Sequence, residues 1–262
     1  MNASADASCA LAPPHQRFRA GPDELRGRVV AVTGAGDGIG RAVALAAAAH
    51  GAQLVLIGRG VRKLEQVHAS IAALAGPEAS IAPLDLDQAV ARDYDQLAHA
   101  LRERYGRLDG LVHNAALLGA LAPIEHYDVP TWCRVMHVNL TAAFALTQVL
   151  LPVLHASTDA SIIFTSSGVA RRPRAYWGAY AVSKAGTEAL AALLAQELES
   201  SGARVNVLNP GPVRTRMRAQ AFPAEDPRTL PAPDEVVGPY LWLLSGASRG
   251  VTGQSLDCQA GR

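Results

Sequence analysis

A glycine-rich segment, "TGAGDGIG" at 33–40, separates a short apolar run from an alanine-rich stretch. The preceding "RVVAVTG" is typical of a buried strand, and the following "IGRAVALAAAAHGA" is typical of a helix that Gly51 ends. Glycines at a strand-to-helix turn let the backbone approach an anion that faces the amino end of the helix. A plain helix cap uses similar glycines, so the rest of the chain must decide between an anion-binding loop and a cap. The chain therefore begins its fold as strand, tight loop and helix.

The same alternation of apolar runs and helical patterns continues along the chain. Strand-like runs recur at 53–58, 80–85, 108–114, 161–167, 204–210 and 254–257, and helical patterns at 61–75, 88–105, 129–156, 178–201 and 233–246. Each strand is apolar nearly throughout, which is typical of a parallel sheet covered by helices on both faces. We predict an α/β fold: a doubly wound (Rossmann) parallel seven-stranded sheet in a single domain, with ligands at its carboxyl edge.

Composition favours one large core and excludes several function classes. The 262 residues are 49% hydrophobic, which suffices for a single domain over 25–262. Residues 1–24 show no periodicity, so we predict a disordered or loosely packed extension there. A net charge of +1 argues against nucleic acid as a partner. Because Cys9, Cys133 and Cys258 lack the spacing of a disulfide framework or a zinc site, we also predict no metal.

The sequence gives no sign of export or membrane insertion. The amino-terminal residues lack the basic segment and apolar core of a signal peptide. We find no run that approaches the roughly 18 apolar residues of a membrane span. We therefore expect a cytoplasmic protein with no membrane partner.

The glycine-rich segment has the context of a dinucleotide-binding loop. Gly34 permits the tight turn, Gly38 lets the backbone approach a pyrophosphate, and Gly40 allows close packing of the helix. The spacing, G-x-x-x-G-x-G, differs from the G-x-G-x-x-G fingerprint. The candidate cofactor-binding residues of this loop are Gly34, Gly36, Asp37, Gly38, Ile39 and Gly40.

A second motif, "YAVSK", places Tyr180 and Lys184 four residues apart on a predicted helix. Side chains at that spacing share one face. The reference pKa of tyrosine is about 10, and a nearby ammonium stabilises the phenolate, which would help Tyr180 to exchange a proton. An isolated pair of this kind is more often an ordinary surface pair. Ser167, thirteen residues before Tyr180, ends a predicted strand.

The motifs occur together in the order of a known family. Residues 28–257 resemble the short-chain dehydrogenase/reductase family through "TGAGDGIG", "HNAA" at 113–116, Asn139, Ser167, "YAVSK" and "NPGPVRT" at 209–215. More narrowly, "RAYWGAY", "MRAQAFPAEDP" and "LDCQAGR" are similar to YciK-type bacterial oxidoreductases. The chain departs from the family pattern at Ala116, where glycine is usual, and in its "DCQAGR" ending. These departures affect the expected cofactor geometry and carboxyl-terminal contacts, not the reaction class.

The resemblance implies an NADP-type carbonyl reductase or alcohol dehydrogenase that transfers hydride between a nicotinamide and a small-molecule carbonyl or alcohol substrate. Tyr180 would be the general acid/base, and Lys184 would also hold the nicotinamide ribose. Ser167 would polarise the substrate oxygen, and Asn139 would support a water-linked proton relay. For Ser167 and Asn139, ordinary hydrogen bonding to nearby groups is the alternative.

The end of the second strand bears on the choice of cofactor. The acidic residue expected of NAD-dependent members is replaced by Gly58, and Arg59 follows. An arginine fork pairs well with a 2′-phosphate, so NADP(H) is favoured over NAD(H), although Asp37 would repel that phosphate. A solvated Arg59 is the alternative. By resemblance, the other cofactor-binding residues are Asp85, Leu86, Asn114, Ala115, Pro210, Gly211, Val213 and Thr215, besides Tyr180 and Lys184.

Residues 216–232 form a long, proline-broken segment that we interpret as a lid over the substrate, with a plain surface loop as the alternative. Arg171, Arg172 and Arg174 could guide an anionic substrate such as an acyl thioester, although a solvated loop is the simpler interpretation. The expected substrate-facing residues are Leu117, Leu118, Ala170, Tyr176, Trp177 and Met217.

Two other functions share some of these features. A non-catalytic NADP(H)-binding redox-sensing protein would have the fold but would not need the Ser, Tyr and Lys set. A nucleotide-sugar epimerase would need a longer carboxyl-terminal domain. Helices 129–156 and 178–201 carry apolar residues beyond one core-facing stripe, and the family pairs these helices across a two-fold axis. We therefore predict a homodimer or homotetramer.

Overall fold

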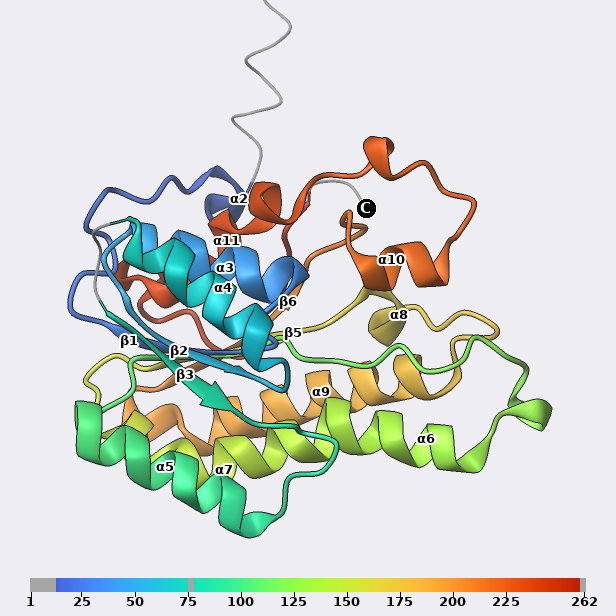
Figure 1. Ribbon diagram of the computed structural model, residues 1–262, viewed down its shortest axis with the longest axis horizontal. Coiled ribbons are helices and arrows are strands. Elements are labelled where there is room, and N and C mark those ends of the chain that lie inside the picture. Colours follow the sequence, from blue (N-terminus) through green and yellow to red (C-terminus); the bar gives the residue numbers. More distant parts are fainter. Residues whose placement is uncertain (1–12, 75–77, 260–262) are drawn as a thin grey trace, which may run out of the picture.

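The computed structural model describes residues 13–74 and 78–259. Its parallel strands form one sheet in the order β3-β2-β1-β4-β5-β6-β7, with helices on both faces (Figure 1). The strands are β1 (Val29–Thr33), β2 (Gln53–Gly58), β3 (Ala79–Pro83), β4 (Gly110–His113), β5 (Ser161–Thr165), β6 (Arg204–Asn209) and β7 (Ser255–Asp257). The main helices are α3 (Gly38–Ala49), α4 (Val61–Ala72), α5 (Ala91–Tyr105), α6 (Val129–Met136), α7 (Ala142–His155), α9 (Gly178–Glu197) and α11 (Gly238–Leu244). The predicted doubly wound, seven-stranded parallel sheet is confirmed.

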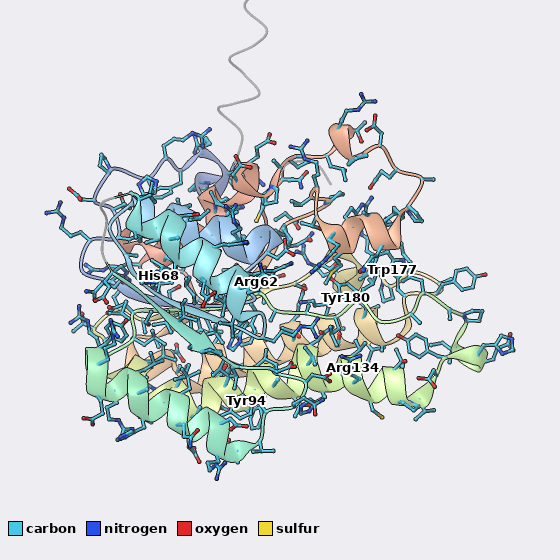
Figure 2. All side chains as sticks on the ribbon, viewed as in Figure 1. Arg62, His68, Tyr94, Arg134, Trp177 and Tyr180 are labelled. Carbon is cyan, nitrogen blue, oxygen red and sulfur yellow. The ribbon has the colours of Figure 1, made fainter. Side chains whose placement is uncertain are left out.

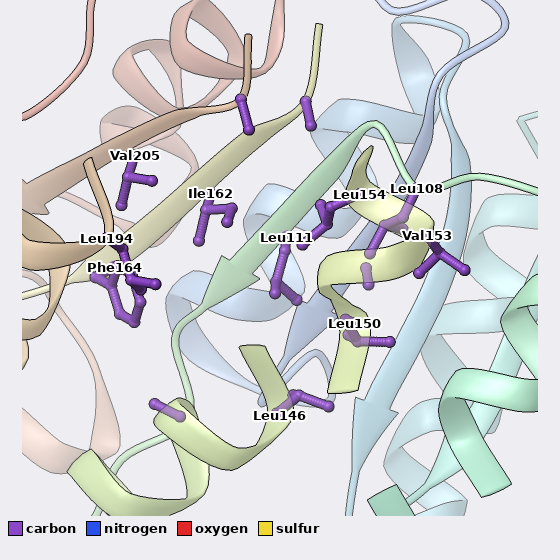
Figure 3. Packing of buried hydrophobic residues seen from close by; sticks show 14 of the residues in the cluster. Leu108, Leu111, Leu146, Leu150, Val153, Leu154, Ile162, Phe164, Leu194 and Val205 are labelled. Atoms are coloured by element: carbon purple, nitrogen blue, oxygen red, sulfur yellow. The ribbon is translucent and has the colours of Figure 1, made fainter. Parts of the chain in front are cut away.

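Successive residues of β1 point to opposite faces of the sheet and enter two separate cores. Val30 and Val32 join the core on the face covered by α3, α4 and α11. Ala31 joins the core on the face covered by α5, α7 and α9. On that second face, Leu146 and Leu150 of α7 pack near Leu111 of β4 (Figure 3). Because both faces are buried at the centre of the sheet, the strands β1, β2, β4 and β5 are apolar nearly throughout.

The predicted helix 129–156 is divided by a wider turn. A π-helical turn, His137–Thr141, joins α6 to α7, and the buried Asn139 lies within it. Such turns insert one extra residue and often occur at functional sites. Apolar periodicity does not reveal a single extra residue, so the sequence predicts an unbroken helix.

By length and composition, the run Val129–His155 could also cross a membrane, so the expectation that no run is this apolar is wrong. Half of its most apolar window is buried inside the fold. Leu146 and Leu150 have no exposed surface, and both belong to the core against the sheet (Figure 3). Core helices of globular domains have the same composition.

The amino-terminal extension is packed where the structure describes it. The short helix α2 (Pro14–Arg17) contacts α11, and His15 is buried beside Trp242 with ring centroids 5.8 Å apart. His15 Nε2 and Gln16 Nε2 lie 3.0 and 2.8 Å from the Asp257 carbonyl oxygen. The helix α2 is therefore packed although a single helical turn has no periodicity to detect, and the boundary near residue 24 stays a prediction. The first twelve residues of the extension lie outside the described ranges.

A buried charge network ties the amino ends of the strands together, at the edge opposite the carboxyl ends. Arg28 precedes β1, Asp159 precedes β5, and Arg204 begins β6. The Asp159 carboxylate accepts from Arg28 Nη2 and from Arg204 Nε, each at 2.9 Å. Loss of one partner from such a buried set typically costs about 3–5 kcal/mol. The network holds the amino ends of β1, β5 and β6 in place relative to one another.

Candidate active site

A cavity of about 2060 Å³ runs along the carboxyl edge of the sheet. Drug-sized ligands fill roughly 300–1,000 Å³, so this cavity has room for a larger ligand or for two ligands together. Of the predicted site residues, all but Gly40 and Asn139 line it: Gly34, Gly36, Asp37, Gly38, Ile39, Arg59, Asp85, Leu86, Asn114, Ala115, Ser167, Tyr180, Lys184, Pro210, Gly211, Val213 and Thr215.

The glycine loop is shaped by conformations and close approaches that other residues would not tolerate. Gly34 and Gly38 have φ values of +67° and +52°. A Cβ on Gly40 would lie 2.4 Å from the Gly34 carbonyl oxygen, so Gly40 supports the loop from behind rather than lining the cavity. Thr33 binds this loop to the end of β4, because its hydroxyl accepts from the backbone N–H groups of Asn114 (2.9 Å) and Ala115 (3.1 Å). Thr33 is the first residue of the glycine-rich motif, and the sequence alone did not predict this role for it.

Asp37 is neutralised by its neighbours. Its carboxylate caps α3 by accepting from Gly38 N at 2.8 Å, and it pairs with Lys63 Nζ at 2.5 Å and with Arg216 Nη2 at 3.1 Å. The hydrogen bond from Lys63 is the main cause that lowers the pKa of Asp37. Lys63 and Arg216 therefore offset the expected repulsion between Asp37 and a phosphate. Neither residue was predicted from the sequence.

Two cations meet at the end of β2. Arg59 is exposed, lines the cavity and has no ion pair or hydrogen bond among the described residues. Lys63, in the first turn of α4, lines the same part of the cavity. Gly58 is the last residue of β2, so no acidic side chain ends this strand. This corner can receive an anion.

Tyr180 and Lys184 project from α9 into the buried centre of the site. Burial raises the pKa of Tyr180 to about 12, and the hydrogen bond with the Ser167 hydroxyl only partly opposes this rise. Burial also lowers the pKa of Lys184 to about 8. Lys184 Nζ lies 5.9 Å from the Tyr180 ring centroid and donates to the Thr165 carbonyl oxygen at 2.7 Å. The net pKa of Tyr180 is therefore raised, because burial of the phenol dominates, and stabilisation of the phenolate by Lys184 stays a prediction.

The two adjacent serines have different surroundings. Ser166 is buried and donates to Glu188 Oε1 at 2.6 Å. Ser167 lines the cavity, and its hydroxyl is hydrogen-bonded to Tyr180. Ser167 is therefore the serine that faces the tyrosine, as the resemblance to the family implies.

Asn139 links two parts of the site from outside the cavity. Its side-chain amide accepts from Leu117 N at 2.7 Å and donates to Leu117 O at 2.9 Å. The same amide donates to Ser183 Oγ at 3.0 Å, and Ser183 Oγ donates to the Tyr180 carbonyl oxygen at 2.8 Å. Asn139 thus joins the loop after β4 to the turn of α9 that carries Tyr180. Its part in a proton relay stays a prediction.

The carboxyl-terminal tail supports the loop after β6. Gln259 Nε2 donates to the carbonyl oxygens of Pro210 (2.7 Å) and Pro212 (2.8 Å). Asp257 accepts from Asn209 Nδ2 at 2.7 Å and from Arg171 Nη2 at 2.9 Å. Sequence reasoning missed Gln259, because only the unusual ending marked this region.

An apolar compartment adjoins Tyr180. Tyr180 packs with Val169 of α8 (Gly168–Arg171), with Trp177, and with Met217 of α10 (Arg216–Ala221). Trp177 and Tyr180 lie near α8 and α10, with ring centroids 5.8 Å apart (Figures 1 and 2). Of the expected substrate-facing residues, four line the cavity and two, Ala170 and Tyr176, do not.

The segment predicted as a lid is anchored at its base. Arg214 N donates to Pro231 O at 2.9 Å, which closes the segment into a loop. Arg218 forms two hydrogen bonds with Glu225, each 2.6 Å, and its guanidinium lies 3.7 Å from the Phe222 ring centroid. Met217 and Phe222 line the cavity. The segment therefore forms one wall of the apolar compartment.

Comparison with known proteins places the chain among oxidoreductases. Residues 28–226 match the family described as short chain dehydrogenase. The chain is 46% identical over 240 residues to the uncharacterized oxidoreductase YciK of Escherichia coli K12, which covers 92% of this chain and 95% of that protein. A crystal structure from Shigella flexneri 2a, complexed with NADP, matches with a TM-score of 0.88, 45% identity, and coverage of 91% of this chain and 100% of that one. A structure from E. coli CFT073, complexed with NADPH, matches with a TM-score of 0.88, 46% identity, and coverage of 91% and 99%.

Proposed function

Because the chain belongs to the short-chain dehydrogenase/reductase family, we propose that it is an NADP(H)-dependent oxidoreductase that interconverts a carbonyl compound and an alcohol. The observation that carries this proposal is the buried Tyr180 hydroxyl, which faces Ser167 one helical turn from Lys184 at the carboxyl edge of the sheet. Proton transfer and polarisation of an oxygen need this set of groups.

The residues along the cavity fit a dinucleotide phosphate. The positive φ of Gly34 and the close approach at Gly40 leave the amino end of α3 open toward the cavity, where a pyrophosphate would bind. Arg59 and Lys63 would hold the 2′-phosphate, and Lys63 would exchange part of its contact with Asp37 for that phosphate. The structures complexed with NADP and NADPH support this assignment. When bound, the nicotinamide supplies or accepts the hydride.

Tyr180 would exchange the proton with the substrate oxygen. Its pKa of about 12 keeps the phenol protonated at neutral pH, which suits donation to a carbonyl oxygen during reduction. Ser167 would donate to the same oxygen and polarise the carbonyl group. As the proton leaves, the phenolate would gain stabilisation from the Lys184 ammonium, which its hydrogen bond to Thr165 holds in place.

The substitution Tyr180→Phe tests this function, because it removes the hydroxyl and keeps the ring. NADPH oxidation is followed across a panel of ketones, aldehydes, quinones and acyl thioesters, and NADPH affinity by fluorescence titration. We expect turnover to fall at least about 100-fold with little change in affinity. Tyr176→Phe, at an exposed tyrosine that does not line the cavity, is the matched control. Wild-type turnover by Tyr180→Phe contradicts the proposal.

A further inference from the structure

Two arginines at the substrate end of the cavity have no partner. Arg172 and Arg174 are exposed, line the cavity, and form no ion pair or side-chain hydrogen bond with any described residue. The other arginines there are engaged: Arg171 with Asp257, Arg216 with Asp37, and Arg218 with Glu225. The carboxylates that line the cavity are Asp37, Asp85, Asp87 and Asp257.

None of these carboxylates neutralises the positive charge of Arg172 and Arg174. Asp37 and Asp257 already bind cations, and Asp87 pairs with Arg134 at 2.7 Å. Asp85 follows β3, at the far end of the sheet from β5 and the arginines. The substrate end therefore carries uncompensated positive charge, and a cleft concentrates such a field on an entering ligand.

The loop that carries these arginines is held in a fixed and strained shape. Pro173 separates Arg172 from Arg174 and limits the backbone between them. Tyr176 has a φ of +72°, a conformation that costs a bulky residue on the order of 1–3 kcal/mol. Its carbonyl oxygen accepts from Ala122 N at 3.0 Å, which holds the loop against the segment after β4. Strain retained beside a binding cavity is typical of a functional loop.

Apolar side chains adjoin the reacting hydroxyl of Tyr180. The Trp177 ring lies 5.8 Å from the Tyr180 ring and 5.9 Å from the Phe222 ring, measured between centroids. Met217 packs against the same cluster. Because Arg174 lies three residues before Trp177 and both line the cavity, we expect a ligand that extends from Tyr180 to the arginines to contact this cluster with an apolar middle portion.

We infer that the substrate is an anionic carbonyl compound whose apolar portion packs on Trp177 and Phe222 and whose carboxylate or phosphate pairs with Arg172 and Arg174. This inference rests on the proposed function for the position of the carbonyl group. The guanidinium fork suits both anions, because each offers oxygen atoms for paired hydrogen bonds.

Binding tests the inference independently of turnover. The NADP-loaded protein is titrated calorimetrically with para-acetylbenzoate, levulinate and a long-chain methyl-ketone carboxylate, each beside its methyl ester. We expect at least one carboxylate to bind tenfold or more tightly than its ester, which corresponds to about 1.4 kcal/mol. Equal affinity within all three pairs overturns the inference. If the carboxylate is preferred but no compound oxidises NADPH, the inference stands and the proposed function fails.

A double variant tests whether Arg172 and Arg174 cause the preference for the carboxylate over its ester. In Arg172→Gln/Arg174→Gln, affinity for the preferred carboxylate should fall at least tenfold, while affinity for the ester and for NADPH stays unchanged. The control is Arg92→Gln/Arg102→Gln, which removes two exposed arginines of α5, and this variant should keep the preference. A double variant that retains the full preference for the carboxylate also overturns the inference, because the anion then binds elsewhere.

Discussion

The Lys184 ammonium donates a 2.7 Å hydrogen bond to the carbonyl oxygen of Thr165, the last residue of β5. This bond joins the helix that carries Tyr180 to the strand that precedes Ser167. Lys184 is almost completely buried, and the burial lowers its pKa to about 8. The lysine therefore has two roles, a structural hydrogen bond that needs one N–H and a charge near the phenol that is lost on deprotonation.

Replacement of Lys184 with Met should affect both cofactor binding and turnover. It removes the charge near Tyr180 and leaves the Thr165 carbonyl oxygen without its donor. We expect turnover to fall at least about 100-fold and NADPH to bind more weakly, in contrast to Tyr180→Phe. In the wild type, the rate of reduction should decline above about pH 8 as Lys184 loses its proton. A pH profile that keeps this decline in Lys184→Met would assign it to another group.

Arg59 should set the preference for NADPH. We expect NADPH to bind at least tenfold more tightly than NADH, since one charge-assisted contact can contribute the corresponding 1.4 kcal/mol or so. Arg59→Ala should lose most of this preference, and Arg62→Ala, at an exposed residue of α4 that does not line the cavity, should keep it (Figure 2). Fluorescence titrations with both cofactors decide the matter. Equal affinities in the wild type would refute the assignment.

His113 should make the fold sensitive to acid. It is buried, stacks on Phe164 at 4.7 Å, and lies 2.8 Å from Thr147 Oγ1. Because that hydroxyl donates to Ala143 O, the imidazole must be the neutral tautomer with its proton on Nε2. Burial, aided by the charge of Lys184, lowers the pKa of His113 from 6.5 to about 3.

The sign of this effect follows from the two pKa values. The unfolded chain binds a proton below about pH 6.5 and the folded chain does not, so stability falls between pH 6.5 and pH 3. The loss reaches the order of 5 kcal/mol at the acid limit, since each pKa unit corresponds to about 1.4 kcal/mol. His113→Gln should flatten this dependence in urea unfolding measured at several pH values. His99→Gln, at an exposed position on α5, should leave it unchanged.

The packed part of the amino-terminal segment should contribute to stability. Removal of residues 1–17 deletes the contacts of His15 and Gln16 with Asp257, which together contribute about 1–3 kcal/mol. For a chain of this size, we expect the melting temperature to fall by roughly 2–10 °C. Removal of residues 1–12 retains these contacts and should have little effect. Equal melting temperatures for both truncations would show that α2 contributes nothing.

Self-association should occur through α7 and α9. Phe144 on α7 and Leu193 on α9 are large apolar side chains that are 47% and 57% exposed. We propose that a second copy covers this face. Phe144→Glu should therefore shift the protein toward monomer in light scattering, and Leu74→Glu, at an exposed leucine after α4, should not. A wild-type monomer at micromolar concentration would contradict the proposal.

The sequence predicted those features that depend on repeated patterns or on fixed spacing. The strands were predicted because apolar runs alternate with helices, and Tyr180, Lys184 and Ser167 because motif spacing places them on neighbouring elements. It could not predict the pairing of Asp37 with Lys63, which are 26 residues apart and meet only after α3 and α4 pack. It also could not predict the Tyr180 pKa, since burial depends on α8 and α10 closing over the ring.

The wide turn at His137–Thr141 means that the number of residues between α6 and α7 cannot change freely. Each residue of an α-helix advances the chain by about 100°, so deletion of one residue here would rotate α6 against α7 by about that angle. Val135 on α6 and Leu150 on α7 are both buried, and after such a rotation the two side chains could not both keep their buried positions. Surface loops tolerate such length changes freely. Shortened variants should therefore keep this five-residue segment at constant length, because its extra residue sets the rotation of α6 relative to α7.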